Sequence, residues 1–207
     1  EVLGKFFKRQ GAVVSSALGS KDDSDWWDEE RWNSELASDL LALFLTSSKE
    51  IANAKAKDLG LGEDFFNSDQ TVEYLRQVAG WRAEAVNATT KNRLDEALEN
   101  GASASDVFDE AISARTASGG TALAAFAASF AVTELSQQAI YQGKASRATK
   151  TWQVNSTRPR ASHAALNGET VGIDETYSNG AKWPGDSILD ASEVAFCSCT
   201  SEVEIEF

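Results

Sequence analysis

The chain has 207 residues, which is long enough for one or two domains with a sizeable buried core. Its 19 basic and 32 acidic residues give a formal net charge of −13, which opposes strong binding to the phosphate backbone of a nucleic acid. No run of about eighteen apolar residues is present, so we expect no membrane span.

The first twenty residues combine glycines and serines with a basic and apolar patch, Phe6 to Arg9. This composition indicates a flexible arm or a short docking helix. The chain begins at Glu1 and contains no methionine, so we expect that it was trimmed or that an upstream stretch precedes it.

Two helical segments are expected next. From Ser24 the apolar residues follow a largely helical spacing, with acidic residues in the first turn and stop signals at Gly60 and Gly62. A second segment begins near Ser68 and ends at Gly101, and Gly80 is a candidate interruption within it.

Three tryptophans stand within seven residues at the start of the first segment. On a helix, adjacent side chains point about 100° apart, so one of the first two can enter the core while the other faces a partner. Because tryptophan is enriched at interface hot spots, we interpret the three as partner-binding residues: Trp26, Trp27 and Trp32. The alternative is that all three belong to the core.

The pattern changes in the second half of the chain. A short helix capped by Ser103 or Ser105 is expected to run to Arg115, followed by a turn at 118–120 and a long alanine-rich helix from 121 to 142. Strand-like segments then follow at 151–154, 170–173 and 203–207. This order predicts an α+β fold, with an N-terminal helical region followed by a small mixed α/β domain that contains a short antiparallel sheet.

Short motifs follow one another in the last third of the chain. Thr133-Glu134 lies on the alanine-rich helix, and Lys150 and Trp152 frame one residue of the first strand. The later motifs are Arg160-x-x-His163-x-x-Leu166-x-Gly168, preceded by Arg158, then Pro184-Gly185-Asp186 and finally Cys197-x-Cys199. In order and spacing they resemble the Mu F-like family of phage minor head proteins, also called head morphogenesis proteins. The chain departs from the family pattern at Asn155, where an acidic residue is usual, and at Ser198, where arginine is usual.

The resemblance covers about residues 101 to 207 and implies a domain there, with residues 1 to 100 as a helical arm or docking region. It implies a non-enzymatic minor head protein of a tailed phage, attached to the portal protein or the major capsid protein in several copies per particle. Such a protein acts in head assembly or DNA ejection, lies inside the capsid of the virion, and passes through the host cytoplasm during assembly. It also implies a structural role for Glu134, Trp152, Arg158, Arg160, His163, Gly168, Pro184, Gly185 and Asp186.

The lone histidine and the only two cysteines also form a candidate metal site. His163, Cys197 and Cys199 offer an imidazole nitrogen and two thiolates, which suit zinc. A fourth ligand would be water or a carboxylate such as Asp174, Glu175 or Asp186. The alternative is that the histidine hydrogen-bonds within a turn and the reduced cysteines pack as small apolar residues. A competing function is a metal-dependent hydrolase or nuclease centred on these three residues.

Charged residues near the motifs have two interpretations each. Glu134 lies on a very apolar helix, so it either pairs inward with Arg158 or Arg160 or faces solvent. The two arginines themselves either bind phosphate together with His163 or brace a turn by donating to backbone carbonyls. The pattern of charges alone leaves both questions open.

Overall fold

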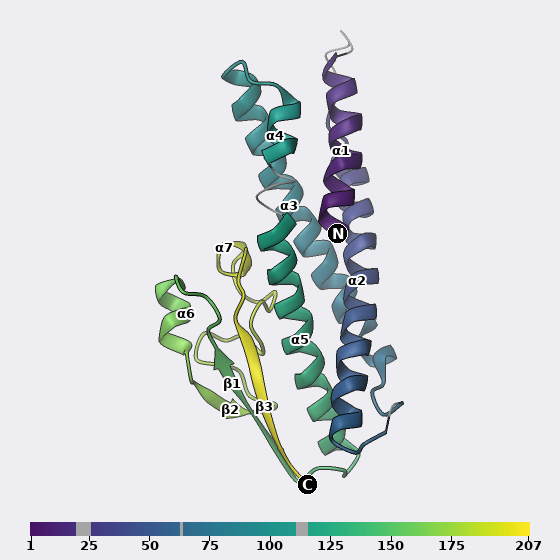
Figure 1. The fold of residues 1–207 in the computed structure, drawn as a ribbon, viewed down its shortest axis with the longest axis vertical. Coiled ribbons are helices and arrows are strands. Elements are labelled where there is room, and N and C mark those ends of the chain that lie inside the picture. Colours follow the sequence, from purple (N-terminus) through teal and green to yellow (C-terminus); the bar gives the residue numbers. More distant parts are fainter. Residues whose placement is uncertain (20–25, 63, 111–115) are drawn as a thin grey trace. The chain divides into compact units, whose positions relative to one another are not determined.

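The computed structural model describes residues 1–19, 26–62, 64–110 and 116–207. Long helices come first along the chain, and a small three-stranded sheet follows (Figure 1). This confirms the predicted α+β fold, with a helical region before a small domain that contains an antiparallel sheet. The elements are α1 (Val2–Gly19), α2 (Glu29–Asp58), the 3₁₀ turn η1 (Ser68–Thr71), α3 (Val72–Glu99), α4 (Ala104–Glu110), α5 (Thr116–Tyr141), β1 (Arg147–Gln153), α6 (Ala161–Leu166), β2 (Thr170–Gly172), α7 (Ala191–Val194) and β3 (Thr200–Glu206).

The chain forms two compact units, and each is described by itself. Unit 1 consists of residues 1–43 and 74–120, and unit 2 consists of residues 44–73 and 121–207. Helices α2, α3 and α5 each contribute residues to both units. The boundary at residue 101 that the family resemblance implies stays a prediction.

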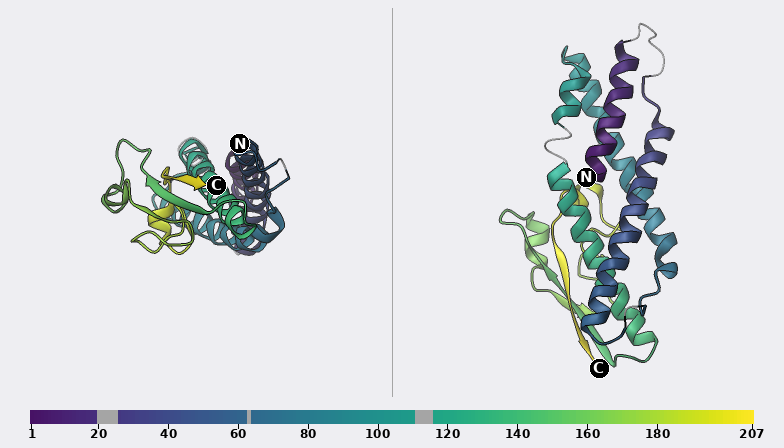
Figure 2. Two further views of the ribbon diagram at one scale, coloured as in Figure 1. Left: turned by 90° about the horizontal axis from the view of Figure 1, so that it is seen from below. Right: turned by 45° about the vertical axis from the view of Figure 1, so that its right-hand side comes forward.

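In unit 1, α1 lies beside the first part of α2 (Figures 1 and 2). The Phe6 ring meets the Trp32 ring edge to face, with centroids 6.3 Å apart, and Arg9 donates to the carboxylates of Glu35 and Asp39. The first twenty residues are therefore a packed helix rather than a flexible arm, as far as the described residues 2–19 extend. Its buried residues lie on one face: Leu3, Phe6, Phe7, Gln10, Gly11 and Val14.

Two glycine predictions were wrong, for different reasons. Gly80 does not interrupt α3, which runs through it as a continuous helix. The expected turn at 118–120 lies inside the first turns of α5. A Cβ atom added at Gly119 would lie 2.9 Å from Cδ1 of Leu3, so glycine at this position permits close approach of α1 to α5.

The helical core of unit 2 is built from aromatic and small side chains. Phe44 of α2 meets Phe126 of α5 edge to face at 5.0 Å. Further along, alanines of the two helices pack together, which lets the helices approach closely. The buried members of this second cluster are Ala52, Ala56, Phe66, Ala131 and Leu135.

The sheet of unit 2 has the order β2-β1-β3, and both pairings are antiparallel. In the central strand β1, Lys150 pairs with Val171 on one side and Val203 on the other. The sheet runs beside α5 (Figures 1 and 2), where the backbone N–H of Ser201 donates to Ser129 Oγ at 3.0 Å. Because side chains alternate along a strand, one face of β1 is fully buried, with Ala148, Lys150 and Trp152 on it.

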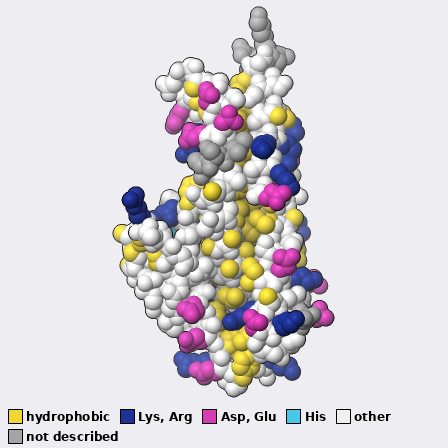
Figure 3. All heavy atoms as spheres, viewed as in Figure 1, with side chains coloured by type: hydrophobic (Ala, Val, Ile, Leu, Met, Phe, Trp, Pro, Cys, Tyr) yellow, Lys and Arg dark blue, Asp and Glu magenta, His cyan; other side chains and the backbone are white. Residues whose placement is uncertain are grey.

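Among the described residues, α5 is the one helix long and apolar enough to cross a membrane, judged by length and composition. Hydrophobic side chains are visible along it in Figure 3. This is weak evidence, because the core helices of other proteins have the same composition, and 39% of the relevant stretch is buried inside the protein. The absence of a membrane partner stays a prediction.

Candidate metal centre

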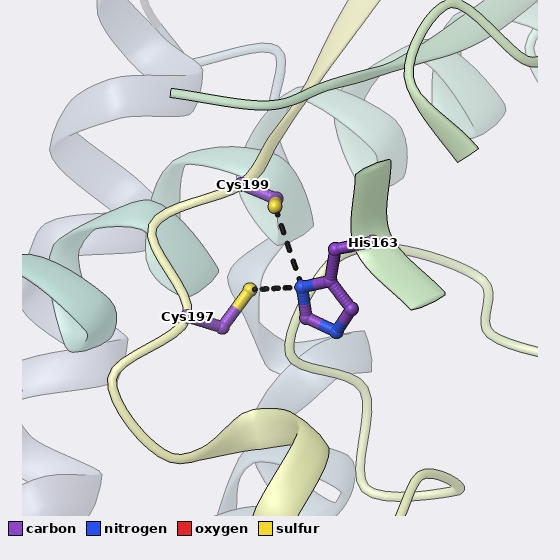
Figure 4. Close-up of side chains that lie close together, drawn as sticks. All are labelled: His163, Cys197 and Cys199. Atoms are coloured by element: carbon purple, nitrogen blue, oxygen red, sulfur yellow. Dashed lines mark hydrogen bonds between the residues drawn. The ribbon is translucent and has the colours of Figure 1, made fainter. Parts of the chain in front are cut away.

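The structure brings the histidine and both cysteines together inside unit 2. His163 lies on α6, and the cysteines lie on the segment between α7 and β3 (Figure 4). Nδ1 of His163 is 3.5 Å from Sγ of Cys197 and 3.5 Å from Sγ of Cys199. The three donor atoms lie within 4.8 Å of one another, and all three residues are buried. The group can therefore hold a metal ion.

The His163 ring also has neighbours at Nε2, on the edge away from the sulfur atoms. Nε2 of His163 lies 3.0 Å from Oε2 of Glu193 on α7, although the two atoms lack the alignment of a hydrogen bond. Ser162 fixes this carboxylate by donating its hydroxyl to Oε2 at 2.8 Å. The Trp152 ring also meets the imidazole edge to face, with centroids 5.6 Å apart. These contacts turn Nδ1 toward the sulfur atoms.

Three contacts shape the loop that carries the cysteines. Asn155 donates its side-chain amide to the Ser198 carbonyl and to Thr200 Oγ1, each at 2.9 Å. The Arg160 guanidinium donates to the Ala195 carbonyl. Phe196 adopts a φ of 56°, a left-handed conformation that costs a residue with a side chain about 1–2 kcal/mol. The surrounding contacts therefore hold the backbone in an unfavourable conformation directly before Cys197.

The two thiols differ in acidity. The pKa of Cys197 is lowered, chiefly because the Cys199 thiol donates a hydrogen bond to the thiolate, with further help from the Cys199 backbone N–H and from the charges of His163 and Arg160. The pKa of Cys199 is raised because its proton is held by Cys197 and because the thiol is buried. Both cysteines are free, and a metal that binds both sulfur atoms would displace the proton of each thiol that is still protonated.

The carboxylates expected as fourth ligands lie elsewhere. Asp174 accepts from Gln137 and Tyr141, and Glu175 accepts from the Gly172 backbone. Asp186 accepts from the backbone N–H groups of two residues in its own loop, Lys182 and Ile188. Within the described residues, the donor group has three members, which leaves water or another external ligand for a fourth position.

Several motif residues shape the backbone around the site. The backbone N–H of Gly168 donates to the Trp152 carbonyl at 2.8 Å, in a turn where Gly168 has a φ of 82°. Gly185 has the same φ between the buried Pro184 and Asp186. The backbone N–H of Arg158 donates to Ser156 Oγ, and the Arg158 side chain is exposed. The glycines are thus used where a side chain would strain the turn.

Of the two interpretations of Glu134, the structure does not show the pairing with Arg158 or Arg160. Burial raises the pKa of the half-buried Glu134 carboxyl, and the cations that oppose this rise are Lys182 and Lys150. Arg160 instead donates to a backbone carbonyl, in agreement with the alternative interpretation of this residue.

The three tryptophans lie in unit 1, away from this site in sequence. Trp26 and Trp27 precede α2, so the prediction that the helix includes them was wrong. Residues 20–25 lie outside the described residues. Trp27 and Trp32 are buried, whereas Trp26 is half-buried with Lys91 Nζ 5.4 Å from its ring centroid. Partner binding by these tryptophans stays a prediction. Because Trp27 and Trp32 are buried, Trp26 is the one of the three whose side chain can reach a partner.

Sequence reasoning missed Glu193 and Asn155 as supports of the metal centre. Glu193 lies on a helix of four residues, which is too short to show a periodic pattern. Asn155 was noted only as a departure from the family pattern, although its position between strand and loop was the available signal. Comparison of the chain with protein-family models, with curated proteins and with solved structures found no match.

Proposed function

We propose that this chain is a structural minor head protein of a tailed phage, associated with the portal protein or the inner capsid wall, and that it acts in head assembly or DNA ejection. The observation that carries the proposal is the convergence of motif residues inside unit 2. The Trp152 ring meets both the His163 ring and the Tyr177 ring edge to face, with centroids 5.6 Å and 5.1 Å away. One buried cluster contains Trp152, Leu166, Tyr177, Ala181, Cys197 and Cys199.

This arrangement favours a structural role for the motifs. Trp152, His163 and Asp186 are all buried, and their contacts are with other parts of the same unit. Residues used in this way stabilise the fold of a small domain, whereas catalytic groups have to meet a substrate. The family resemblance supplies the location, which is the interior of the capsid.

We further propose that the metal is zinc. Zinc lies about 2.3 Å from thiolate sulfur and about 2.0 Å from imidazole nitrogen, so tetrahedral geometry separates the nitrogen from each sulfur by about 3.5 Å. Both nitrogen–sulfur distances in the structure are 3.5 Å. The carboxylate of Glu193 beside Nε2 corresponds to the outer-shell partner that histidine ligands commonly have. Bound zinc would join α6 to the segment before β3.

The experiment for the head-protein proposal is co-sedimentation with emptied phage particles or with purified portal and capsid assemblies. Attachment is expected to persist across a salt series, because a protein of net charge −13 would not be held by phosphate contacts. Trp26→Ala is expected to weaken attachment. Trp81→Ala, which removes another half-buried tryptophan of unit 1, is the matched control. Release of the protein together with digested DNA would contradict the proposal.

The second candidate is a metal-dependent hydrolase or nuclease. It is favoured by the three-member donor group, because catalytic zinc sites keep one position for water. Glu193 lies at the edge of the imidazole opposite the sulfur atoms, so it orients the ring rather than serving as a base at the metal. Cleavage of a phosphodiester that requires stoichiometric zinc and is lost in Cys199→Ser would favour this candidate over the structural role.

A further inference from the structure

A cleft of about 310 Å³ opens beside the candidate metal centre. Both cysteines line it, together with Arg158 and Arg160 from the segment before α6, and His163 is not part of its wall. The cleft therefore reaches the donor group from the side of the sulfur atoms. Phe196, which is 53% exposed, forms part of the rim.

The two arginines give the cleft a positive end. Lys and Arg side chains are visible beside α6 at this edge of unit 2 in Figure 3. Arg160 is anchored through its bond to the Ala195 carbonyl, while the Arg158 side chain is exposed. A guanidinium presents several N–H donors in a plane, which matches the oxygens of a phosphate group.

The formal charges also favour an anion. A divalent metal and two thiolates sum to zero, Glu193 adds one negative charge and the two arginines add two positive charges. The site would thus carry a charge of about +1 within a chain whose net charge is −13. A phosphate oxygen can also occupy the fourth position that the three protein donors leave at the metal.

We propose that this cleft binds a phosphate group, either inorganic phosphate or a small phosphate monoester, with one phosphate oxygen on the metal and the others facing Arg158 and Arg160. The proposal rests on the proposed metal and goes beyond the proposed role in the phage head. The volume of the cleft is at the lower end of the range for ligand pockets, roughly 300–1,000 Å³, so a small ligand fits it better than a duplex.

Cobalt(II) provides the test, because its visible absorption reports both thiolate ligation and the identity of a fourth ligand. The reduced full-length protein would be loaded with cobalt(II) and titrated with inorganic phosphate, then with AMP and with adenosine. We expect a saturable spectral change with phosphate and AMP and none with adenosine. A change with phosphate alone would identify the free ion as the ligand, and a tighter response to AMP would identify a monoester.

Arg158→Gln is expected to weaken the phosphate response about tenfold or more, as for loss of a charged hydrogen bond. Arg158→Lys should restore part of the response. Arg147→Gln, an exposed arginine of β1 outside the cleft, is the matched control and should respond as the wild type does. Circular dichroism of each variant checks that the fold is retained.

The outcomes separate the proposals from one another. If cobalt(II) binds with a thiolate band but phosphate leaves the spectrum unchanged, the phosphate proposal is overturned and the metal proposal stands. If phosphate acts equally on the wild type and on Arg158→Gln, the cleft is not its site, and the proposal is overturned. If no cobalt(II) binds, both the metal and the phosphate proposals are overturned. Attachment to phage particles is measured independently, so the head-protein proposal is not affected by any of these results.

Discussion

The side-chain amide of Asn155 donates to the carbonyl of Ser198, the residue between the two cysteines, at 2.9 Å. Asn155 and Ser198 are also the two positions at which the chain departs from the Mu F-like pattern. An amide with N–H donors can fasten the cysteine loop through its backbone, whereas an ionised carboxylate accepts hydrogen bonds only. Asparagine at position 155 can therefore hold the loop through the Ser198 carbonyl, and this hydrogen bond does not involve the Ser198 side chain.

Replacing Asn155 by alanine should therefore loosen the cysteine loop. We expect the free energy of unfolding to fall by about 1 kcal/mol and the zinc affinity to fall about tenfold, because the support of the ligands is lost. Urea denaturation and competition with a chromogenic chelator measure the two effects. Thr157→Ala, at an exposed position of the same segment, serves as the control. Unchanged zinc affinity in Asn155→Ala would show that the loop is held by other contacts.

Glu193 offers a separate test of the metal centre, because it lies on the imidazole edge remote from the sulfur atoms. Glu193→Gln removes the negative charge while keeping the size of the side chain. We expect zinc to bind roughly 10–100-fold more weakly, with little change in the stability of the metal-free protein. Glu204→Gln, on the exposed side of β3, controls for the loss of one acidic residue. Equal affinities for the two variants would contradict a supporting role for Glu193.

Replacing glycine by alanine should have opposite effects on stability at two helical positions, Gly11 and Gly80. In α1, a Cβ atom at Gly11 would lie 2.9 Å from Cγ of Phe108 and 3.2 Å from its Cβ, so Gly11→Ala should push α1 away from α4. We expect a loss of about 1–3 kcal/mol in the free energy of unfolding. In α3, nothing lies within 4 Å of a Cβ atom at Gly80, so Gly80→Ala should stabilise the helix by about 0.5–1 kcal/mol. Thermal and urea denaturation of both variants measure these changes. A stabilised Gly11→Ala or a destabilised Gly80→Ala would contradict the prediction.

The features that could be predicted from sequence are those with local signatures. The α+β order followed from the strand-like segments that come after the long alanine-rich helix. The grouping of His163 with the cysteines followed from the order of the motifs. The helix through Gly119 could not be predicted, because the reason for that glycine is the close approach of Leu3, which is distant in sequence. The location of Glu134 among lysines likewise depends on tertiary packing.

The environment of Lys150 depends both on its local strand and on tertiary packing. It shares the inward face of β1 with Ala148 and Trp152, but the strand predicted at 151–154 began one residue after it, so its burial was not predicted. Its side chain is fully buried, and its ammonium donates to the Ile173 carbonyl at 2.9 Å. The aromatic ring of Tyr177 lies 5.6 Å from Nζ. Burial and the nearby charge of Lys182 lower the pKa of Lys150 from 10.5 to about 8, against the opposing effect of Asp174.

This lowered pKa predicts how stability depends on pH. Between pH 8 and 10.5 the unfolded chain binds more protons at Lys150 than the folded protein does, so the stability of the folded state rises with pH across this window and is constant below it. Lys150→Met lacks this dependence. The free energy of unfolding of Lys150→Met minus that of the wild type should therefore fall from pH 7.5 to pH 10, by at most about 3 kcal/mol. Urea denaturation across the pH series measures the difference, and Lys144→Met, at an exposed position, should show no such trend. A constant difference for Lys150→Met would mean that the buried ammonium keeps its ordinary pKa through stronger pairing with the surrounding carboxylates.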